Sequence, residues 1–302
     1  MKPRGVRRGK VVSAQAKNKL LGYLLFFPSG AILIAIVLWP LIWALITSFS
    51  TYTFVFPVWD TFVWFDNFLE ALKDQYFLNS LYVICKFVVC VVFLEFFLGF
   101  VIAFLLSRDI KFKVVFYTIL AIPMVMAPVA VALMWRMFLH TELGIANYLI
   151  RTVGFTPVNW LGSSKTAFWT VLMVDIWHQI SFMILILLAG FVSLPKEPYE
   201  AAAIDGASGL QRLIYITFPL MKPVIVIALL LRTIFAFKTF DLIYVLTRGG
   251  PGVSTDVLSY YIYRVTFSSL NLAGGCAQSY LFLAIVMTVA VFLFRAMRGT
   301  QI

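Results

Sequence analysis

Between two long apolar stretches of this chain, residues Glu200 to Pro219 read EAAAIDGASGLQRLIYITFP. The segment is short, carries several polar residues and combines small with apolar side chains. A membrane protein that has few polar residues outside its spans offers few surfaces where a soluble partner can bind. We therefore interpret this segment as a docking surface for such a partner.

The local sequence predicts two short helices joined by a turn. Pro195 and Pro198 end the preceding apolar stretch and favour the start of a helix, where Glu200 complements the positive end of the helix dipole. Ala201–Ala203 are the strongest helix formers. Asp205-Gly206 then predicts a turn, because glycine adopts positive φ without a steric penalty.

A second short helix is predicted from about Ser208, and Pro219 is predicted to end it and to begin the next span. One face of that helix collects residues at positions i, i+3, i+4 and i+7: Leu210, Leu213, Ile214 and Thr217. The alternative is a helix lying on the membrane surface, which is usually rich in Lys and Arg. Arg212 is the one basic residue here, and Glu200 and Asp205 would be repelled by anionic headgroups, so docking is favoured.

Composition identifies an all-α integral membrane protein. The 302 residues are 62% hydrophobic and 12% charged, whereas soluble domains contain roughly a quarter charged residues. A helix needs about 20 residues to cross a bilayer, and six such spans are predicted. A membrane β-barrel is excluded because the apolar runs are continuous rather than alternating. The spans lie near Leu20–Ile46, Leu81–Leu106, Val114–Leu139, Ala167–Val192, Leu220–Phe240 and Leu272–Phe294.

Prolines are predicted to kink two of these spans, the first at Pro28 and Pro40 and the third at Pro123 and Pro128. We expect three parts: a basic tail at residues 1–19, a transmembrane domain at 20–298 that includes the loop at 194–219, and a short tail at 299–302. The three cysteines fall in predicted spans and are expected to pack there without a disulfide or a metal.

Basic residues set the orientation. Arg108, Lys111 and Lys113 lie between the second and third spans, and Arg295 and Arg298 lie after the sixth. Seven more precede the first span without any acid: Lys2, Arg4, Arg7, Arg8, Lys10, Lys17 and Lys19. The first external loop is acidic instead: Asp60, Asp66, Glu70 and Asp74. The positive-inside bias therefore predicts that both termini and the Glu200 loop are cytoplasmic. The net charge of +11 is mainly this topology signal, and nucleic-acid binding is disfavoured.

At the Glu200 loop the chain resembles the permease subunits of bacterial binding-protein-dependent ABC sugar importers. Their cytoplasmic signature is Glu-Ala-Ala, three residues, Gly, nine residues, Ile, one residue, Leu-Pro. The matching residues are Glu200, Ala201, Ala202, Gly206, Ile216 and Pro219, and Phe218 replaces the leucine. Further segments look like the same family: Phe65–Phe68, Asn159–Leu161, Asp175–Trp177, Ile204–Ala207 and Phe240–Pro251.

The resemblance covers about residues 20 to 298 and is nearest to the first permease of maltose and glycerol-3-phosphate systems. It implies the six-helix type I importer permease (MetI-like) fold in the bacterial cytoplasmic (inner) membrane. It also implies a second permease subunit, two ATPase subunits that bind ATP and magnesium, and an extracytoplasmic solute-binding protein. In such importers the loop sits in a cleft of the ATPase, where Glu200 faces a basic residue. The chain itself lacks a phosphate-binding loop, so ATP must bind elsewhere and no cofactor is expected here.

Ionisable residues at membrane depth are candidates for function. Lys86, Arg136 and Lys238 lie near span ends, where they could reach the interface. On the fourth span Asp175, His178, Gln179 and Phe182 recur on one face, and on the fifth Arg232, Ala236 and Thr239 do so. Both faces could line a carbohydrate path, as the corresponding helices do in maltose-type relatives. The alternative is that Asp175 and His178 only satisfy another helix or a loop.

Four cations and two acids lie at membrane depth, so an acidic sugar, an oligouronate or a phosphorylated polyol is one solute class, and a neutral oligosaccharide is another. On the first hypothesis, Arg232→Met should abolish uptake of the anion and spare assembly. A secondary transporter of a small polar solute is the alternative function, but it would need inverted repeats, and the sequence shows none. An enzyme is disfavoured because His140 and His178 are the only histidines and neither has a catalytic set around it.

Overall fold

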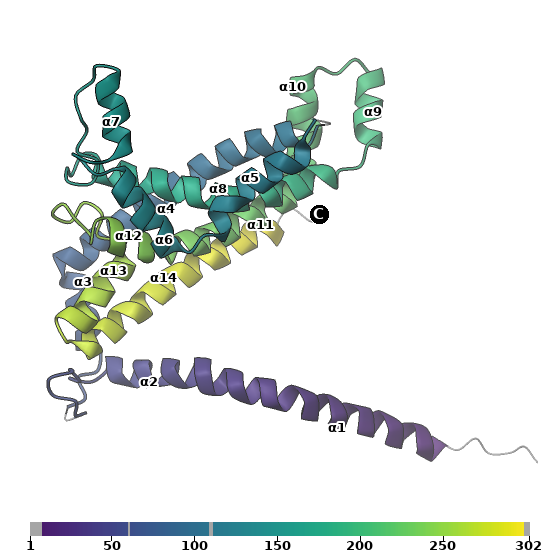
Figure 1. The fold of residues 1–302 in the computed structure, drawn as a ribbon. Helices are drawn as coiled ribbons and strands as arrows, with labels where there is room; N and C mark the ends of the chain where they lie inside the picture. Colours follow the sequence, from purple (N-terminus) through teal and green to yellow (C-terminus); the bar gives the residue numbers. More distant parts are fainter. Residues whose placement is uncertain (1–7, 60, 109–110, 299–302) are drawn as a thin grey trace, which may run out of the picture.

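The computed structural model describes residues 8–59, 61–108 and 111–298 and shows a helical bundle (Figure 1). Sequence predictions that involve residues 1–7, Asp60, Asp109 and 299–302 lie outside the described residues. The long helices are α1 (Arg8–Leu33), α2 (Trp39–Ser48), α4 (Gln75–Leu106), α5 (Lys113–Val125), α6 (Pro128–Phe138), α8 (Ala167–Val192), α11 (Phe218–Phe237) and α14 (Leu272–Arg298). Shorter helices connect them: α3 (Asp66–Lys73), α7 (Ile145–Thr152), α9 (Glu197–Ile204), α10 (Gly209–Arg212), α12 (Asp241–Leu246) and α13 (Leu258–Tyr263).

Six membrane crossings are consistent with the described helices. Five runs are long and apolar enough to span: Leu21–Ser48, Gln75–Leu106, Ala167–Val192, Gly209–Phe237 and Leu272–Arg295. The first run joins α1 to α2 through a π-helical segment, η1 (Ile34–Leu38), between Pro28 and Pro40. The helix already begins at Arg8, inside the segment predicted as the tail at residues 1–19.

The third span differs from the single kinked helix that the sequence predicted. It consists of α5 and α6, which meet at an angle of 96°. Pro123 lies inside α5, and Pro128 is at the start of α6. Because a proline disfavours the helical region for the residue before it, Ala127 adopts an extended conformation with ψ of 134°. The two prolines therefore break the span.

The prediction that Pro219 ends the second loop helix is wrong. The helix continues from α10 through a π-helical segment, η2 (Leu213–Thr217), directly into α11. Phe218 donates its N–H to the carbonyl of Leu213, five residues earlier. The wider π turn carries the chain into α11 with Pro219 among its first residues, where no N–H is needed.

The α4–α8 pair forms the centre of the bundle, and glycines allow its close packing. A Cβ on Gly99 of α4 would lie 2.8 Å from Cγ of Met183 on α8. A Cβ on Gly190 of α8 would lie 2.8 Å from Cγ1 of Val224 on α11. Small residues at helix contacts are typical of membrane bundles, where van der Waals packing replaces the hydrophobic effect.

The short helices divide between the two ends of the bundle. Helices α3, α7, α12 and α13 lie at one end, whereas α9, α10 and the end of α14 lie at the other (Figure 1). A third π-helical segment, η3 (Arg264–Ser268), follows α13. The predicted breaker turn is present at Thr247–Gly252, with positive φ at Arg248, Gly249 and Gly252. With six crossings, this arrangement agrees with cytoplasmic termini and a cytoplasmic α9–α10 loop.

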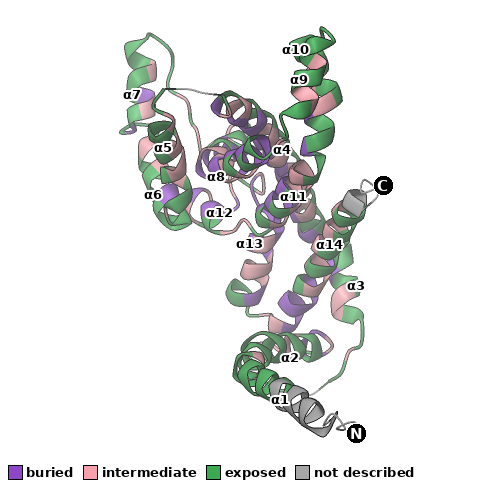
Figure 2. Ribbon diagram, turned by 90° about the vertical axis from the view of Figure 1, so that its right-hand side faces the viewer, coloured by how far each residue is buried: buried purple, intermediate pink, exposed green. Residues whose placement is uncertain are grey.

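Helices α1 and α2 stand apart from the bundle. Their large apolar side chains are mostly exposed, and only 6% of the most apolar window of this span is buried (Figure 2). Tyr280 of α14 donates a hydrogen bond of 2.5 Å to the carbonyl of Leu41, in the first turn of α2. The described part of the first span thus contacts the bundle mainly through α2.

Candidate functional site

The cytoplasmic loop forms the predicted pair of short helices. Glu197 and Glu200 lie in the first turn of α9, and Pro198 is among its first residues. Gly206 follows α9 with φ of +75°, a conformation that favours glycine. Ser208 begins α10 with a capping box, because its hydroxyl accepts from the N–H of Gln211 and the Gln211 side chain accepts from the N–H of Ser208.

The loop presents large apolar side chains to the surroundings. Ile204 is 87% exposed, Leu210 66% and Tyr215 75%. Thr217, predicted on the same face as Leu210, is instead buried, and its hydroxyl oxygen accepts a hydrogen bond of 2.9 Å from the hydroxyl of Tyr199. The predicted apolar face therefore divides into an exposed part and a part that attaches the loop to the bundle.

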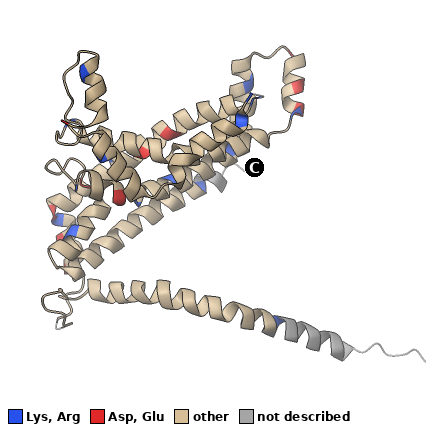
Figure 3. Ribbon diagram, in the orientation of Figure 1, with Lys and Arg blue, Asp and Glu red and all other residues tan. Residues whose placement is uncertain are grey.

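The residues that match the family signature differ in exposure. Glu200, Ala201, Asp205 and Pro219 are exposed, and Ala202 and Ile216 are half-buried. A cavity of about 680 Å³ lies between the loop and the cytoplasmic ends of α4, α5 and α8. Its wall includes Lys113, Lys196, Tyr199, Glu200 and Arg212. The loop thus projects away from the spans and remains joined to them by η2 (Figure 3).

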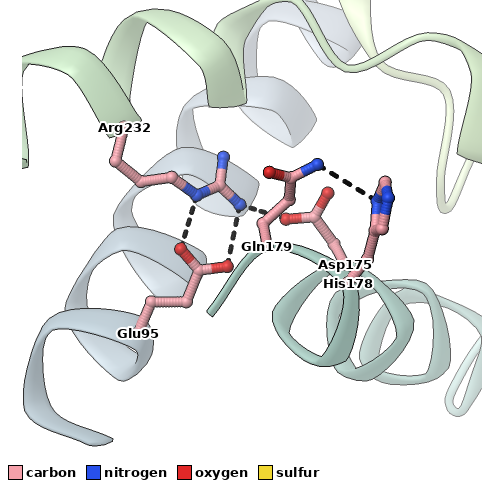
Figure 4. Close-up of polar contacts among 5 residues, drawn as sticks. All are labelled: Glu95, Asp175, His178, Gln179 and Arg232. Carbon is pink, nitrogen blue, oxygen red and sulfur yellow. Dashed lines mark hydrogen bonds and ion pairs between the residues drawn. The ribbon is translucent and has the colours of Figure 1, made fainter. Parts of the chain in front are cut away.

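A second candidate site is a charged cluster inside the bundle (Figure 4). Arg232 of α11 donates from Nε and Nη2 to the carboxylate of Glu95 on α4, with Nη2 to Oε1 at 2.9 Å. Nη2 also donates to Asp175 on α8. All three side chains are nearly fully buried, with Arg232 at 1% exposure. The cluster joins three spans and has a net charge of −1 when both acids are ionised.

His178, three residues after Asp175 on α8, contacts the break between α5 and α6. Its Nε2 lies 3.1 Å from the carbonyl of Met126, and its Nδ1 lies 3.1 Å from Nε2 of Gln179. A carbonyl only accepts and an amide NH₂ only donates, so these contacts fit the neutral tautomer with hydrogen on Nε2. The imidazole thereby satisfies a carbonyl near the break, where the helical hydrogen bonds stop.

The predicted polar faces of α8 and α11 do meet, at a small cavity of about 140 Å³. Asp175, His178, Gln179 and Thr239 belong to its wall, together with Lys238 and Asp241. Phe182 makes an edge-on contact with Phe235 at 5.4 Å between ring centres. Ala236 is fully buried, and Arg232 does not belong to the cavity wall.

The sequence suggested that Arg232 contacts an anionic solute, but in this structure it is paired with two carboxylates. Two carboxylates already neutralise it, so it offers no free positive charge to an anionic solute in this conformation. For Asp175 and His178 the geometry agrees with the alternative that they satisfy another helix and a loop, although both also border the cavity. Sequence reasoning missed Glu95 as the partner of Arg232. The signal was available, since each is an isolated charge at similar depth in its span.

Comparison with known proteins gives a consistent result. Residues 95–299 match the family model described as binding-protein-dependent transport system inner membrane component. The chain is 35% identical to the trehalose/maltose transport system permease protein of Thermococcus litoralis over 90% of this chain and 91% of that protein. It is 34% identical to the sn-glycerol-3-phosphate transport system permease protein of Brucella abortus biovar 1, over 92% of this chain and 94% of the relative.

Solved structures show a similar fold. A chain in the crystal structure of a bacterial alginate ABC transporter, in complex with an alginate pentasaccharide-bound periplasmic protein, superposes with a TM-score of 0.84. The match covers 95% of this chain and 98% of that chain at 21% identity. The helical arrangement thus belongs to a known fold.

Proposed function

This chain belongs to the family of inner membrane components of binding-protein-dependent transport systems, and we propose that it forms one wall of a carbohydrate path driven by ATP hydrolysis on separate subunits. It is a transport subunit and not an enzyme. Two ATPase subunits would dock on its cytoplasmic loop and on that of a second permease. A binding protein would deliver the solute at the external end.

The observation that carries this proposal is the exposed apolar surface of α9 and α10. Ile204, Leu210 and Tyr215 project from a loop that lies beyond the ends of the spans. Large apolar side chains on a projecting loop are costly in water and are typical of protein–protein contacts. The loop also continues through η2 into α11, whose Arg232 is tied to α4 and α8. Movement of the loop would therefore reach the centre of the bundle.

The small cavity supports a path shared with another subunit. Binding pockets for small molecules usually enclose about 300–1,000 Å³, whereas the cavity at Asp175 and His178 has about 140 Å³. One wall of a larger path fits this size better than a complete site. The second permease would supply the opposite wall, and α1 would pack against it, because the bundle leaves that helix largely uncovered.

The solute class is inferred from the cavity wall and from relatives. Carboxylate, imidazole, amide and hydroxyl groups line the cavity beside Phe235 and Phe240. Such groups pair with sugar hydroxyls, and aromatic rings cover the apolar faces of sugars. The relatives carry trehalose or maltose and glycerol-3-phosphate in their names, which are hydroxyl-rich solutes. Lys238, which borders the cavity, is the better candidate than Arg232 for an anionic substituent.

Co-purification tests the proposal. A tagged chain, expressed with the proteins of its own transport system, should bring down an ATPase subunit and a second permease in detergent. Radiolabelled candidate sugars should accumulate only when the binding protein is present and ATP is hydrolysed. A chain that purifies alone and transports solute in liposomes without ATP would contradict the proposal and favour a secondary transporter.

A further inference from the structure

A third cavity lies at the external end of α4, beside the start of α8, and shares no wall residue with the two cavities described above. It has a volume of about 620 Å³ and is bounded by α4, the start of α8 and the turn at 251–254. Two amines line it, those of Lys86 and Lys165, and no carboxylate does. Among the described residues, neither lysine forms a salt bridge. The pocket therefore has an uncompensated positive charge.

Lys86 lies at the outer edge of the membrane core. Helix α4 has 32 residues, so at 1.5 Å per residue it is about 48 Å long and exceeds the hydrocarbon core of about 30 Å. Its first turns must lie outside the core, and Lys86 lies about 16 Å along the axis from Gln75. Lys165 comes just before α8 begins at Ala167. Both amines are thus near the level of the outer headgroups.

The face of α4 that carries Lys86 is otherwise apolar and exposed. Tyr82 is 65% exposed, Val89 68% and Phe93 65%, and these residues share the face at helical spacing. Nothing in the described chain covers this face, so in the membrane it would contact acyl chains. The Lys86 ammonium lies 4.3 Å from the ring centre of Phe168. An ammonium in such surroundings still requires an anion, because a cation–π contact only partly compensates its lost hydration.

An apolar groove begins beside Cys85, next to Lys86 in the chain, and extends further into the membrane. It has a volume of about 710 Å³, and Val89, Val92 and Phe93 of α4 form one wall. Leu229 of α11 and Phe292 of α14 belong to the other walls. A cationic pocket at headgroup level above an apolar groove matches the two chemical parts of a phospholipid.

We propose that this face binds one anionic phospholipid from the leaflet that faces away from the cytoplasm. Its phosphate would accept hydrogen bonds from the Lys86 and Lys165 ammonium groups, and an acyl chain would occupy the groove beside Val89 and Phe93. A zwitterionic lipid carries the same phosphate together with an ammonium group, which the two lysines repel. The site therefore selects an anionic headgroup. This inference does not depend on which solute the chain transports.

Native mass spectrometry of the purified transport complex tests the proposal. The complex is equilibrated with an equimolar mixture of phosphatidylglycerol and phosphatidylethanolamine that have identical acyl chains. The wild type should retain phosphatidylglycerol roughly tenfold over phosphatidylethanolamine, since each lysine near the headgroup favours the anion. Lys86→Gln with Lys165→Gln should bring that ratio close to one. The matched control, Lys73→Gln with Arg151→Gln, removes two exposed external charges elsewhere and should leave the ratio unchanged.

A groove variant separates the lipid from a free anion. Val89→Trp fills the groove while both lysines remain, and it should reduce retention of phosphatidylglycerol severalfold. Phe97→Trp, which lies on the same exposed face outside the groove, should not. Equal retention of the two lipids by the wild type would overturn the proposal, as would complete displacement of phosphatidylglycerol by excess inorganic phosphate. The first result would mean a surface without headgroup selection, and the second an ordinary anion site.

Discussion

Arg232 shows how one residue can be a functional candidate in the sequence and a structural centre in the fold. A buried guanidinium that donates to two carboxylates on two other helices fixes the mutual positions of α4, α8 and α11. The arrangement is bidentate toward Glu95, the geometry in which Arg binds carboxylates most strongly. Its removal would leave two buried acids facing each other without a counter-charge.

Arg232→Met should therefore destabilise the chain, which reverses the sequence-based expectation that this variant spares assembly. Removing one partner of a buried ion pair typically costs about 3–5 kcal/mol. We expect a large fall in the thermal unfolding midpoint of the purified complex. Adding Glu95→Gln and Asp175→Asn to Arg232→Met should recover most of it, because no buried charge remains. Lys238→Met serves as the exposed control. An Arg232→Met complex as stable as the wild type would contradict this role.

Asp256 is a further buried acid, in the external connection between α12 and α13, where Arg264 donates to it. Burial raises the pKa of the Asp256 carboxyl to about 6, although Arg264 and Ser80 act to lower it. The folded state then binds the proton more tightly than the unfolded state, whose pKa is near 3.8. The protonated Asp256 carboxyl therefore stabilises the folded state below about pH 4, and this contribution to the free energy of unfolding is lost as the pH rises to about 6.

Asp256→Asn should remove that part of the pH dependence. The unfolding midpoint of the variant, relative to the wild type, should rise between about pH 4 and pH 6 and stay constant above. Thermal unfolding of both proteins between about pH 4 and pH 7 shows whether the difference between their midpoints changes in this direction. A difference between them that does not change with pH would show that the Asp256 carboxyl stays ionised throughout.

At the scale of elements, the glycine between α9 and α10 sets the direction of the docking surface. Gly206 has φ of +75° and has no atom within 4 Å of the place where a Cβ would lie. A substitution therefore acts through the backbone alone. A side chain in the left-handed region costs about 1–2 kcal/mol, and the loop can relieve that cost by rotating α10 away from its position.

Gly206→Ala should lower ATP-driven uptake without loss of the folded chain. Gly209→Ala is a matched control, because Gly209 also has open space around it but has no positive φ and lies in the first turn of α10. Alanine favours a helix there, so uptake should be retained. Uptake is measured in proteoliposomes with the chain at equal amounts. Equal activity of the two variants would show that the turn does not position the docking surface.

Much of this element pattern could be predicted from sequence. The apolar runs predict the spans, the prolines and alanines predict the loop helices, and Asp205-Gly206 predicts the turn. The break at Ala127 was predicted only as a kink, because two prolines five residues apart do not fix an angle. Pro219 was expected to end a helix, since its own chemistry does not reveal the π turn before it. The isolated charges at membrane depth were visible in the sequence, but which of them pair with Arg232 was not fixed, because it depends on how three spans are rotated against one another.

At the scale of the whole molecule, the first span is the main feature without a packing partner, because the rest of the described chain leaves it largely uncovered. From Leu21 onward, helix α1 carries apolar side chains on nearly all sides, and Phe27 is 72% exposed. A photo-crosslinking phenylalanine derivative in place of Phe27 should form an adduct with the second permease in intact membranes. The same derivative in place of Phe97, on the face of α4 assigned to lipid, should form none. Adducts of Phe27 with lipid only would contradict the packing proposed for α1.

The central claim is that an ATPase subunit binds the exposed surface of α9 and α10, and Ile204 reports on it most directly. A photo-crosslinking derivative in place of Ile204, which is 87% exposed, is irradiated in intact membranes. Phe155, 70% exposed at the external end, is the control. We predict a major adduct between position 204 and the nucleotide-binding subunit and none from position 155. Adducts of position 204 with lipid alone would contradict the account.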